Sequence, residues 1–194
     1  MSGYPVPVSA TSRPAAVWGM AILIASEGTL FVALIGTYFY LRFKSPHWPP
    51  DGLPEPRVAI PLLLVAALLA SSIPMALASA AAQAGRLAAT RRFILLALVL
   101  QSGYFAYEVH DFSDQLRSVD ISRDAYSSIY YTLLGADHAH VALGLLFNLW
   151  LLWKLARGLT TYRRHAVQAI AWYWHAVNLL TLIAIGTLLS AAVG

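Results

Sequence analysis

The alternation of long apolar runs with short polar segments predicts five membrane-spanning helices. The first run, residues 17–43, is long enough at about 1.5 Å per residue to cross a bilayer core of roughly 30 Å. Four further apolar runs follow it, separated by short segments rich in arginine, proline or aspartate. We therefore expect an all-α polytopic membrane protein, a bundle of five transmembrane helices. The expected spans are 17–43, 58–84, 92–110, 126–155 and 165–192.

Proline marks the interruptions in this pattern. Pro61 falls in the first turn of the second span, but Pro74 falls inside it and should kink the helix unless neighbouring groups satisfy the freed carbonyl. The segment 45–57 is too rich in proline to be helical. Residues 1–16 hold three prolines and no apolar core, so we expect a flexible tail and no signal peptide. Residues 17–194 are expected to form a single transmembrane domain.

The composition narrows the class further. Of 194 residues, 59% are hydrophobic and 11% are charged, whereas soluble domains carry about 25% charged residues. One membrane domain fits this composition, and there is no room for a separate soluble domain. The chain contains no cysteine, which excludes disulfides, thiolate metal sites and cysteine nucleophiles. Its net charge of +4 comes from short loops, where membrane orientation explains it better than nucleic acid does.

The lysines and arginines are distributed unequally between the two ends of the spans. Because basic loops stay inside, we expect the N-terminus inside and, with five spans, the C-terminus outside. The expected inner side carries eight: Arg13, Arg86, Arg91, Arg92, Lys154, Arg157, Arg163 and Arg164. The expected outer side carries five: Arg42, Lys44, Arg57, Arg117 and Arg123.

Ionisable and amide side chains inside the spans are the candidate functional residues. Glu27 lies in the middle of the first span, where an unpaired charge costs about 2.5 kcal/mol or more. Asp137 and His140 are three residues apart and share a helix face, while His138 points about 100° away. The intramembrane set is Glu27, Gln101, Glu108, Asp137, His138, His140, His175 and Asn178.

Two histidines on different spans raise the possibility of a haem or copper site. His140 lies about 17 residues, or roughly 25 Å, from Arg157, and His175 lies about 10 residues, or roughly 15 Å, from Arg164. Ligands of one haem iron lie at nearly the same depth, and these two differ by roughly 10 Å. We therefore expect no metal ligand and no cofactor in this chain.

The same arithmetic predicts how the polar residues group. It places Glu27 at the depth of His175, so we expect these two to interact, with Glu108, Asp137 and His140 near the outer side. One interpretation is that these clusters hold helices together, each contact contributing about 0.6 to 2 kcal/mol. The other is that Glu27 lines a proton path. Both interpretations stay open at the level of the sequence.

Arginines near the expected inner face are candidates for anionic lipid head groups, although orientation explains them about as well. The tryptophans are placed toward span ends, as interface anchors would be. The lipid-binding candidates are Arg86, Arg91, Arg92, Arg163, Arg164 and Trp172.

Four segments of the chain resemble a set of motifs that occur together in one known family of membrane proteins. Residues 18–31, WGMAILIASEGTLF, resemble W-G-x-x-x-F-I-x-S-E-x-x-x-F, and residues 47–72 resemble W-P-P-x-G…P…P-L-L-N-T…L-L-x-S-S. Residues 126–144 end in GADHAHVALG, similar to T-G-x-H-G-x-H-V-x-x-G, and residues 171–180, AWYWHAVNLL, resemble Y-W-H-F-V-D-V-V-W. Together they resemble the cytochrome c oxidase subunit III family of haem–copper oxidases. The four lie in that family's order and nearly span the chain, in the short five-helix form.

The resemblance assigns family positions to individual residues. Glu27 takes the family's buried glutamate, His140 the second histidine of H-G-x-H-V, His175 the Y-W-H histidine and Glu108 the Q-x-x-E-Y glutamate. The chain departs from the pattern at several places. Asp137 replaces the first histidine, His138 the glycine, Asn178 the aspartate and Phe105 the glutamine.

The resemblance implies a non-catalytic subunit in the plasma membrane of a bacterium. Such a subunit packs mainly on subunit I, in a complex with subunit II, binds phospholipid and supports stability and proton uptake. Haem and copper would lie in the partner subunits. Three alternatives remain: an accessory subunit of a nitric oxide reductase, a haem-binding membrane protein, and a small transporter.

Overall fold

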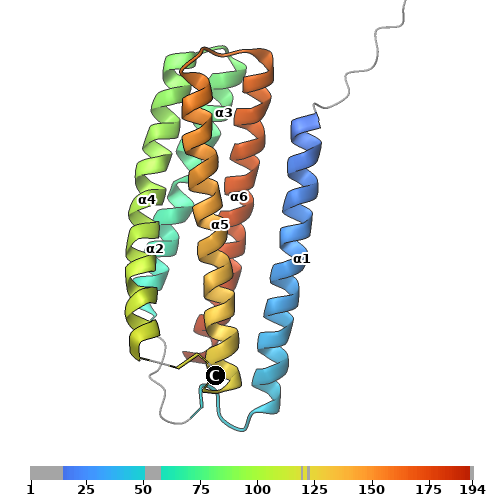
Figure 1. The fold of residues 1–194 in the computed structure, drawn as a ribbon, viewed down its shortest axis with the longest axis vertical. Helices are drawn as coiled ribbons and strands as arrows, with labels where there is room; N and C mark the ends of the chain where they lie inside the picture. Colours follow the sequence, from blue (N-terminus) through green and yellow to red (C-terminus); the bar gives the residue numbers. More distant parts are fainter. Residues whose placement is uncertain (1–14, 51–57, 119, 122, 193–194) are drawn as a thin grey trace, which may run out of the picture.

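The computed structural model describes residues 15–50, 58–118, 120–121 and 123–192, and these form a bundle of long helices (Figure 1). Within these described residues, four segments are long and apolar enough to cross a membrane: α1, the joined pair α2 and α3, α4, and α6. The prediction of an all-helical polytopic bundle is confirmed. The helices are α1 Ala15–Lys44, α2 Ala59–Ala70, α3 Ser72–Gln83, α4 Leu87–Ser118, α5 Ala125–Leu155 and α6 Thr161–Leu189, and a 3-10 turn, Ser190–Ala192, follows.

The remaining long helix, α5, runs the length of the bundle beside α4 and α6 (Figure 1). It carries an aspartate, two histidines and an asparagine within 31 residues, and these polar residues interrupt its apolar sequence. Its ends match the predicted span 126–155 to within one residue. Asp124 caps its start by accepting a 2.7 Å hydrogen bond from the backbone N–H of Ser127.

The other helix ends differ from the sequence prediction by larger margins. Helix α4 continues to Ser118, eight residues beyond the predicted end, because polar side chains pair along its last turns. His110 and Asp114 lie 3.4 Å apart, and Gln115 donates a 2.5 Å hydrogen bond to Asp111. Helix α1 begins two residues earlier than predicted, and the rest of the expected tail lies outside the described residues, as does segment 51–57.

The second span is interrupted at Ser71, three residues before Pro74. Here the Ser71 N–H bonds to the carbonyl of Leu68 at 3.0 Å, a tightened turn between α2 and α3. Side chains of α4 and α6 hydrogen bond to the interruption, as described below. The helix is therefore interrupted one turn ahead of the proline, and the neighbouring side chains bond to Leu68, Ser71 and Ser72.

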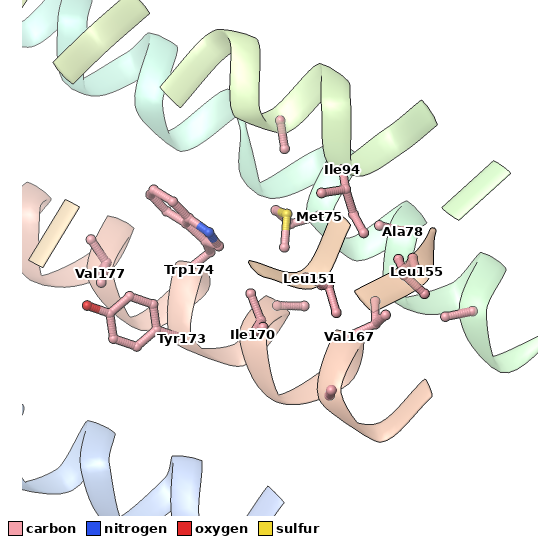
Figure 2. Packing of buried hydrophobic residues seen from close by; sticks show 14 of the residues in the cluster. Met75, Ala78, Ile94, Leu151, Leu155, Val167, Ile170, Tyr173, Trp174 and Val177 are labelled. Atoms are coloured by element: carbon pink, nitrogen blue, oxygen red, sulfur yellow. The ribbon is translucent and has the colours of Figure 1, made fainter. Parts of the chain in front are cut away.

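Helix α6 is the centre of the bundle and contacts α1, α2, α3 and α5. Figure 2 shows the apolar core beside it, where Met75, Ile94, Leu151 and Val167 converge from α3, α4, α5 and α6. Trp174 is fully buried in this core, so the expectation that it anchors an interface is wrong.

Close packing between α5 and α6 depends on one glycine. A Cβ atom placed on Gly144 would lie 2.7 Å from Cζ2 of Trp174, closer than side chains tolerate. The absence of a side chain at Gly144 therefore lets the indole fill the space between the two helices.

Helix α1 stands at the edge of the bundle (Figure 1), and its contacts with other α-helices among the described residues are with α5 and α6. Its buried residues are few: Val17, Phe31 and Tyr38. Near its C-terminal end, Tyr38 accepts a 3.0 Å hydrogen bond from the Trp48 indole and Arg42 donates one of 2.6 Å to Ser190. The polar contact in its N-terminal half belongs to the site described next.

Candidate functional site

Two histidines on α5 direct their outer ring nitrogens toward acids on different helices. His140 Nε2 lies 2.7 Å from Oε2 of Glu27 on α1, and His138 Nε2 lies 3.6 Å from Oε2 of Glu108 on α4. The two histidines are two positions apart, or about 200° around the helix, so they address opposite sides of α5. Helix α5 is thereby connected through acid–histidine contacts to both α1 and α4.

The inner ring nitrogens are held in the same way in both histidines. His140 Nδ1 lies 2.6 Å from the carbonyl oxygen of Ala136, and His138 Nδ1 lies 2.6 Å from that of Leu134. A carbonyl only accepts, so each Nδ1 carries the hydrogen. Each Nε2 is then left to face its acid.

This arrangement fixes the proton content of the Glu27–His140 pair. A 2.7 Å hydrogen bond between Nε2 and Oε2 requires one proton between them, because Nδ1 is already a donor. The proton resides either on the imidazole, giving an ion pair, or on the carboxyl group, giving two neutral groups. In both cases the pair is neutral overall, which avoids the cost of a lone charge at mid-span.

His140 is also the meeting point of three helices. Phe31 of α1 packs edge-on against its ring, with centroids 5.1 Å apart. Tyr173 of α6 donates a 2.9 Å hydrogen bond to its backbone carbonyl. The Glu27 side chain is 25% exposed while that of His140 is 11% exposed, so the pair lies at the margin of the bundle.

The α4 side of the helix holds a second, more deeply buried group. Asp137 is 1% exposed and accepts a 2.6 Å hydrogen bond from Thr181 of α6. His138 and Glu108 are 7% and 8% exposed, and the ring of Phe112 lies 5.1 Å from that of His138.

Several buried polar atoms of this group have no hydrogen-bond partner among the described residues: Tyr104 Oη, Asp137 Oδ2 and His138 Nε2. Buried polar atoms are rarely left unpaired, and ordered water commonly pairs them. This side of α5 therefore has buried polar atoms that can form further hydrogen bonds, whereas the facing atoms of Glu27 and His140 are already paired.

A chain of uncharged polar groups lies deeper in the bundle. Gln101 of α4 accepts a 2.8 Å hydrogen bond from Asn148 of α5 and donates one of 3.3 Å to Ser71. Asn178 of α6 donates to the Leu68 carbonyl at 3.2 Å and to Ser72 Oγ at 2.7 Å. These bonds join α4, α5 and α6 to the interruption between α2 and α3.

The predicted interaction of Glu27 with His175 is wrong. Glu27 bonds to His140, while His175 lies on an exposed face of α6. The depth arithmetic failed because it used arginines as helix ends. His140 lies 15 residues before the end of α5 at Leu155, and His175 lies 14 residues after the start of α6 at Thr161, so they share one depth.

Depth therefore does not separate His140 from His175, but direction does. His140 faces α1, and His175 points away from the bundle. Among the residues that the structure describes, no three histidine, aspartate or glutamate side chains converge as a metal-binding set.

His138 is among the intramembrane polar residues singled out from the sequence, pointing about 100° away from Asp137, but the sequence predicts no partner for it. That direction is what brings it to Glu108. Asn148 and Thr181 were missed as well, since an uncharged polar residue in an apolar helix gives no sequence signal for its partner.

The arginines singled out as lipid candidates gather at one end of the bundle, where α3 meets α4 and α5 meets α6 (Figure 1). Arg91 donates to the carbonyl of Leu155, and Arg163 donates to that of Gly158 at 2.8 Å. Arg91 thereby stabilises the C-terminal end of α5, where the last carbonyls lack helical partners, and Arg163 stabilises the turn that follows the helix. Arg86 and Arg92 are exposed.

The remaining two candidates differ in position. Arg164 lies against the turn after α3, and its guanidinium nitrogen is 3.3 Å from where a Cβ on Gly85 would stand. Trp172 is 36% exposed but lies near the middle of α6, eight residues, or about 12 Å, from Arg164. The arginines therefore form one group, and Trp172 is separate from it.

A surface cavity of about 170 Å³ lies beside this basic end, between the end of α5 and the start of α6. Lys154 and Arg163 supply its positive charge, and Trp150 and Tyr162 its aromatic walls. The Lys154 ammonium also lies 4.8 Å from the centroid of the Trp153 ring.

The sequence model of the family described as cytochrome c oxidase subunit III matches residues 9–188. The chain belongs to the cytochrome c oxidase subunit III family. It is thus a subunit of the haem–copper oxidase type, which implies a multi-subunit oxidase complex.

Similar curated subunit III proteins come from distant organisms. The chain is 25% identical over 170 residues to cytochrome c oxidase subunit 3 of Synechocystis, covering 86% of this chain and 72% of that protein. It is 26% identical over 186 residues to the Papio hamadryas protein, covering 92% and 69%. It is 30% identical over 173 residues to the Heterololigo bleekeri protein, covering 85% and 66%.

The structure divides the subunit III motif residues into two groups. Glu27 and His140, which match family positions, bond directly to each other. Asp137 and His138, which depart from the motif, form the buried group on the α4 side with Glu108.

Proposed function

We propose that this chain is the non-catalytic subunit III of a haem–copper terminal oxidase in aerobic respiration. It packs mainly on subunit I, in a complex that also contains subunit II, and the haem and copper belong to those partners. The observation that carries the proposal is the family match over residues 9–188, supported by four motifs in register.

A stabilising role agrees with how the buried polar residues are used. Glu27, Gln101, Asn178 and Asp137 each hydrogen bond to a residue of a different helix, so they hold the bundle together. A subunit whose polar groups serve helix packing offers a rigid surface to a larger partner. We assign this chain to the plasma membrane of a bacterium, with the arginine-rich end in the cytoplasm.

A contribution to proton uptake is proposed for Glu27 and His140. The pair shares one proton, and its two forms differ only in which residue holds it. Glu27 is a quarter exposed, which gives the shared proton access to the margin of the bundle. The shared proton moves between the two residues without placing a net charge in the membrane, and the pair stays neutral during uptake only if it releases one proton as it accepts another.

Phospholipid binding is proposed at the arginine-rich end. Anionic head groups suit the cavity beside Lys154 and Arg163, where Tyr162 and Trp150 supply an amphipathic wall at interface depth. Arg86 and Arg92 extend the positive surface at the neighbouring turn. Arg91 also stabilises the end of α5 and Arg163 the turn after it, which gives both a structural role alongside lipid contact.

The test is a mild-detergent purification through a tag on this chain, with a subunit inventory and a reduced-minus-oxidised spectrum. We expect haem to co-purify with a large multi-spanning partner and to leave with it when the partner is stripped. Haem that stays with the 21 kDa chain would contradict the proposal. So would the absence of any coloured partner.

A further inference from the structure

We propose that the outward face of α6 around His175 receives a transmembrane helix of another oxidase subunit, and that this helix supplies a hydrogen bond to the imidazole. The inference rests on the proposed function, since it names the surface by which this chain joins the complex. The face, called the His175 face, consists of Gln168, Trp172, His175, Leu179, Leu182 and Gly186.

His175 is in an unusual position for a histidine in a membrane helix. It lies at the middle of α6, 14 residues from each end, and its side chain is exposed. Ionisable groups at this depth almost always face the bundle interior or a polar partner. A side chain that faces out at mid-membrane therefore indicates that something other than hydrocarbon covers it.

The other two membrane histidines of the chain show what is missing. His138 and His140 each place Nδ1 against their own helix carbonyl and direct Nε2 at an acid on a second helix. No hydrogen bond joins His175 to any described residue. Exposed Ser26, Thr29 and Thr37 on α1 bond to carbonyls of their own helix and need no partner. His175 bonds neither to an acid on a second helix nor to a carbonyl of its own helix among the described residues.

The spacing of the His175 face fits a helix as its cover. Its members alternate at intervals of four and three, from Gln168 through Trp172, His175 and Leu179 to Leu182 and Gly186. This interval pattern is the seam of a left-handed helix pair, which crosses at about 20°. Leu179 and Leu182 are 56% and 42% exposed, and a Cβ on Gly186 would meet nothing within 4 Å.

The chemistry of the face favours a protein partner over lipid. Acyl chains offer the imidazole no hydrogen bond, and Gln168 adds a second polar group about two turns away on the same seam. A second transmembrane helix satisfies both and packs closely at Gly186. Because the family implies a multi-subunit complex, the occupant is assigned to another subunit of that complex and not to a second copy of this chain.

The first experiment places the photo-cross-linker p-benzoylphenylalanine at Leu179 in the intact complex. Leu96 on α4, 52% exposed, is the matched control position. We expect the Leu179 adduct to join this chain to a peptide from another oxidase subunit. An adduct with lipid alone, with a second copy of this chain, or no adduct would overturn the proposal.

Substitution of His175 separates the hydrogen bond from the packing. We expect His175→Leu to dissociate from the complex about threefold to tenfold faster under a detergent wash, and His175→Gln to restore much of the retention. Equal retention of the Leu variant and the wild type would overturn the role of the hydrogen bond. If haem-bearing partners co-purify while Leu179 reaches lipid alone, this inference fails and the proposed function stands. If no partner co-purifies, both fail.

Discussion

A 2.7 Å hydrogen bond joins His140 of α5 to Glu27 of α1, two residues 113 positions apart in the chain. It is the polar contact in the N-terminal half of α1, a helix that buries few side chains and stands at the edge of the bundle. The contact explains why a carboxyl group is tolerated in the middle of the first span. Substitution of either residue is therefore expected to affect the attachment of α1 to the bundle.

We expect Glu27→Ala to insert normally but to weaken the attachment of α1. The substitution leaves His140 Nε2 without a partner, which costs about 1–3 kcal/mol. Glu27→Gln keeps a donor for Nε2 and serves as the matched control. Thermal unfolding of the purified complex and the rate of activity loss during turnover measure the effect, and an Ala variant as stable as the Gln variant would contradict it.

A double-mutant cycle tests the pair directly. We expect Glu27→Ala and His140→Ala to be coupled by about 0.6 to 1.7 kcal/mol in the free energy of unfolding. The same cycle with Glu27→Ala and His175→Ala should give a coupling near zero, since His175 is exposed on another face. The reverse order of couplings would show that the depth-based pairing was right after all.

We expect Gly144→Ala to destabilise the contact between α5 and α6. The added methyl group would lie 2.7 Å from the indole of Trp174, which is fully buried and has no room to move aside. Overpacking of this kind costs about 1–3 kcal/mol. Gly103→Ala on α4 is the control, because its Cβ would meet nothing within 4 Å. Chemical unfolding in detergent compares the two, and similar stability losses would refute the explanation.

The Gln101–Asn148 bond provides a test of buried polar packing. We expect Gln101→Leu to destabilise the chain by about 1–3 kcal/mol, because it strands the Asn148 amide in a fully buried site. Adding Asn148→Leu should recover part of that loss, since both unpaired groups are then removed. Unfolding of the single and double variants measures this. If the stability loss of the double variant equals the sum of the losses of the two single variants, the two side chains are not coupled and the explanation is wrong.

For the basic end, we expect a Lys154→Gln, Arg86→Gln double variant to co-purify with less anionic phospholipid. Both residues add positive charge at this end. Arg91 and Arg163 are left unchanged because they hydrogen bond to the end of α5 and to the turn after it. Arg123→Gln at the opposite end of the bundle is the control. Lipid mass spectrometry of the purified complex measures the change. An equal loss in the control variant would show that lipid binding depends on the net charge of the protein and not on this end of the bundle.

Local sequence was enough to determine the helical membrane bundle and the family. Apolar runs of membrane length can satisfy their backbone only as helices, so their number and rough limits follow from the chain itself. Arginines at span ends, the proline-interrupted second span and the four motifs are also properties of short stretches. The end of α4 was misplaced because side-chain pairs of its polar extension keep a helix going beyond the apolar run.

Which polar residues meet was decided only by the tertiary structure. Counting residues along the chain does not predict which partner is contacted by Glu27, His138, His140 or His175. Contact depends on how each helix is rotated and where its ends lie relative to its neighbours. Moving two helix ends by a few residues removed the apparent 10 Å between His140 and His175. Rotation then turned one histidine toward α1 and the other away from the bundle, because packing of the apolar faces fixes the rotation of every helix.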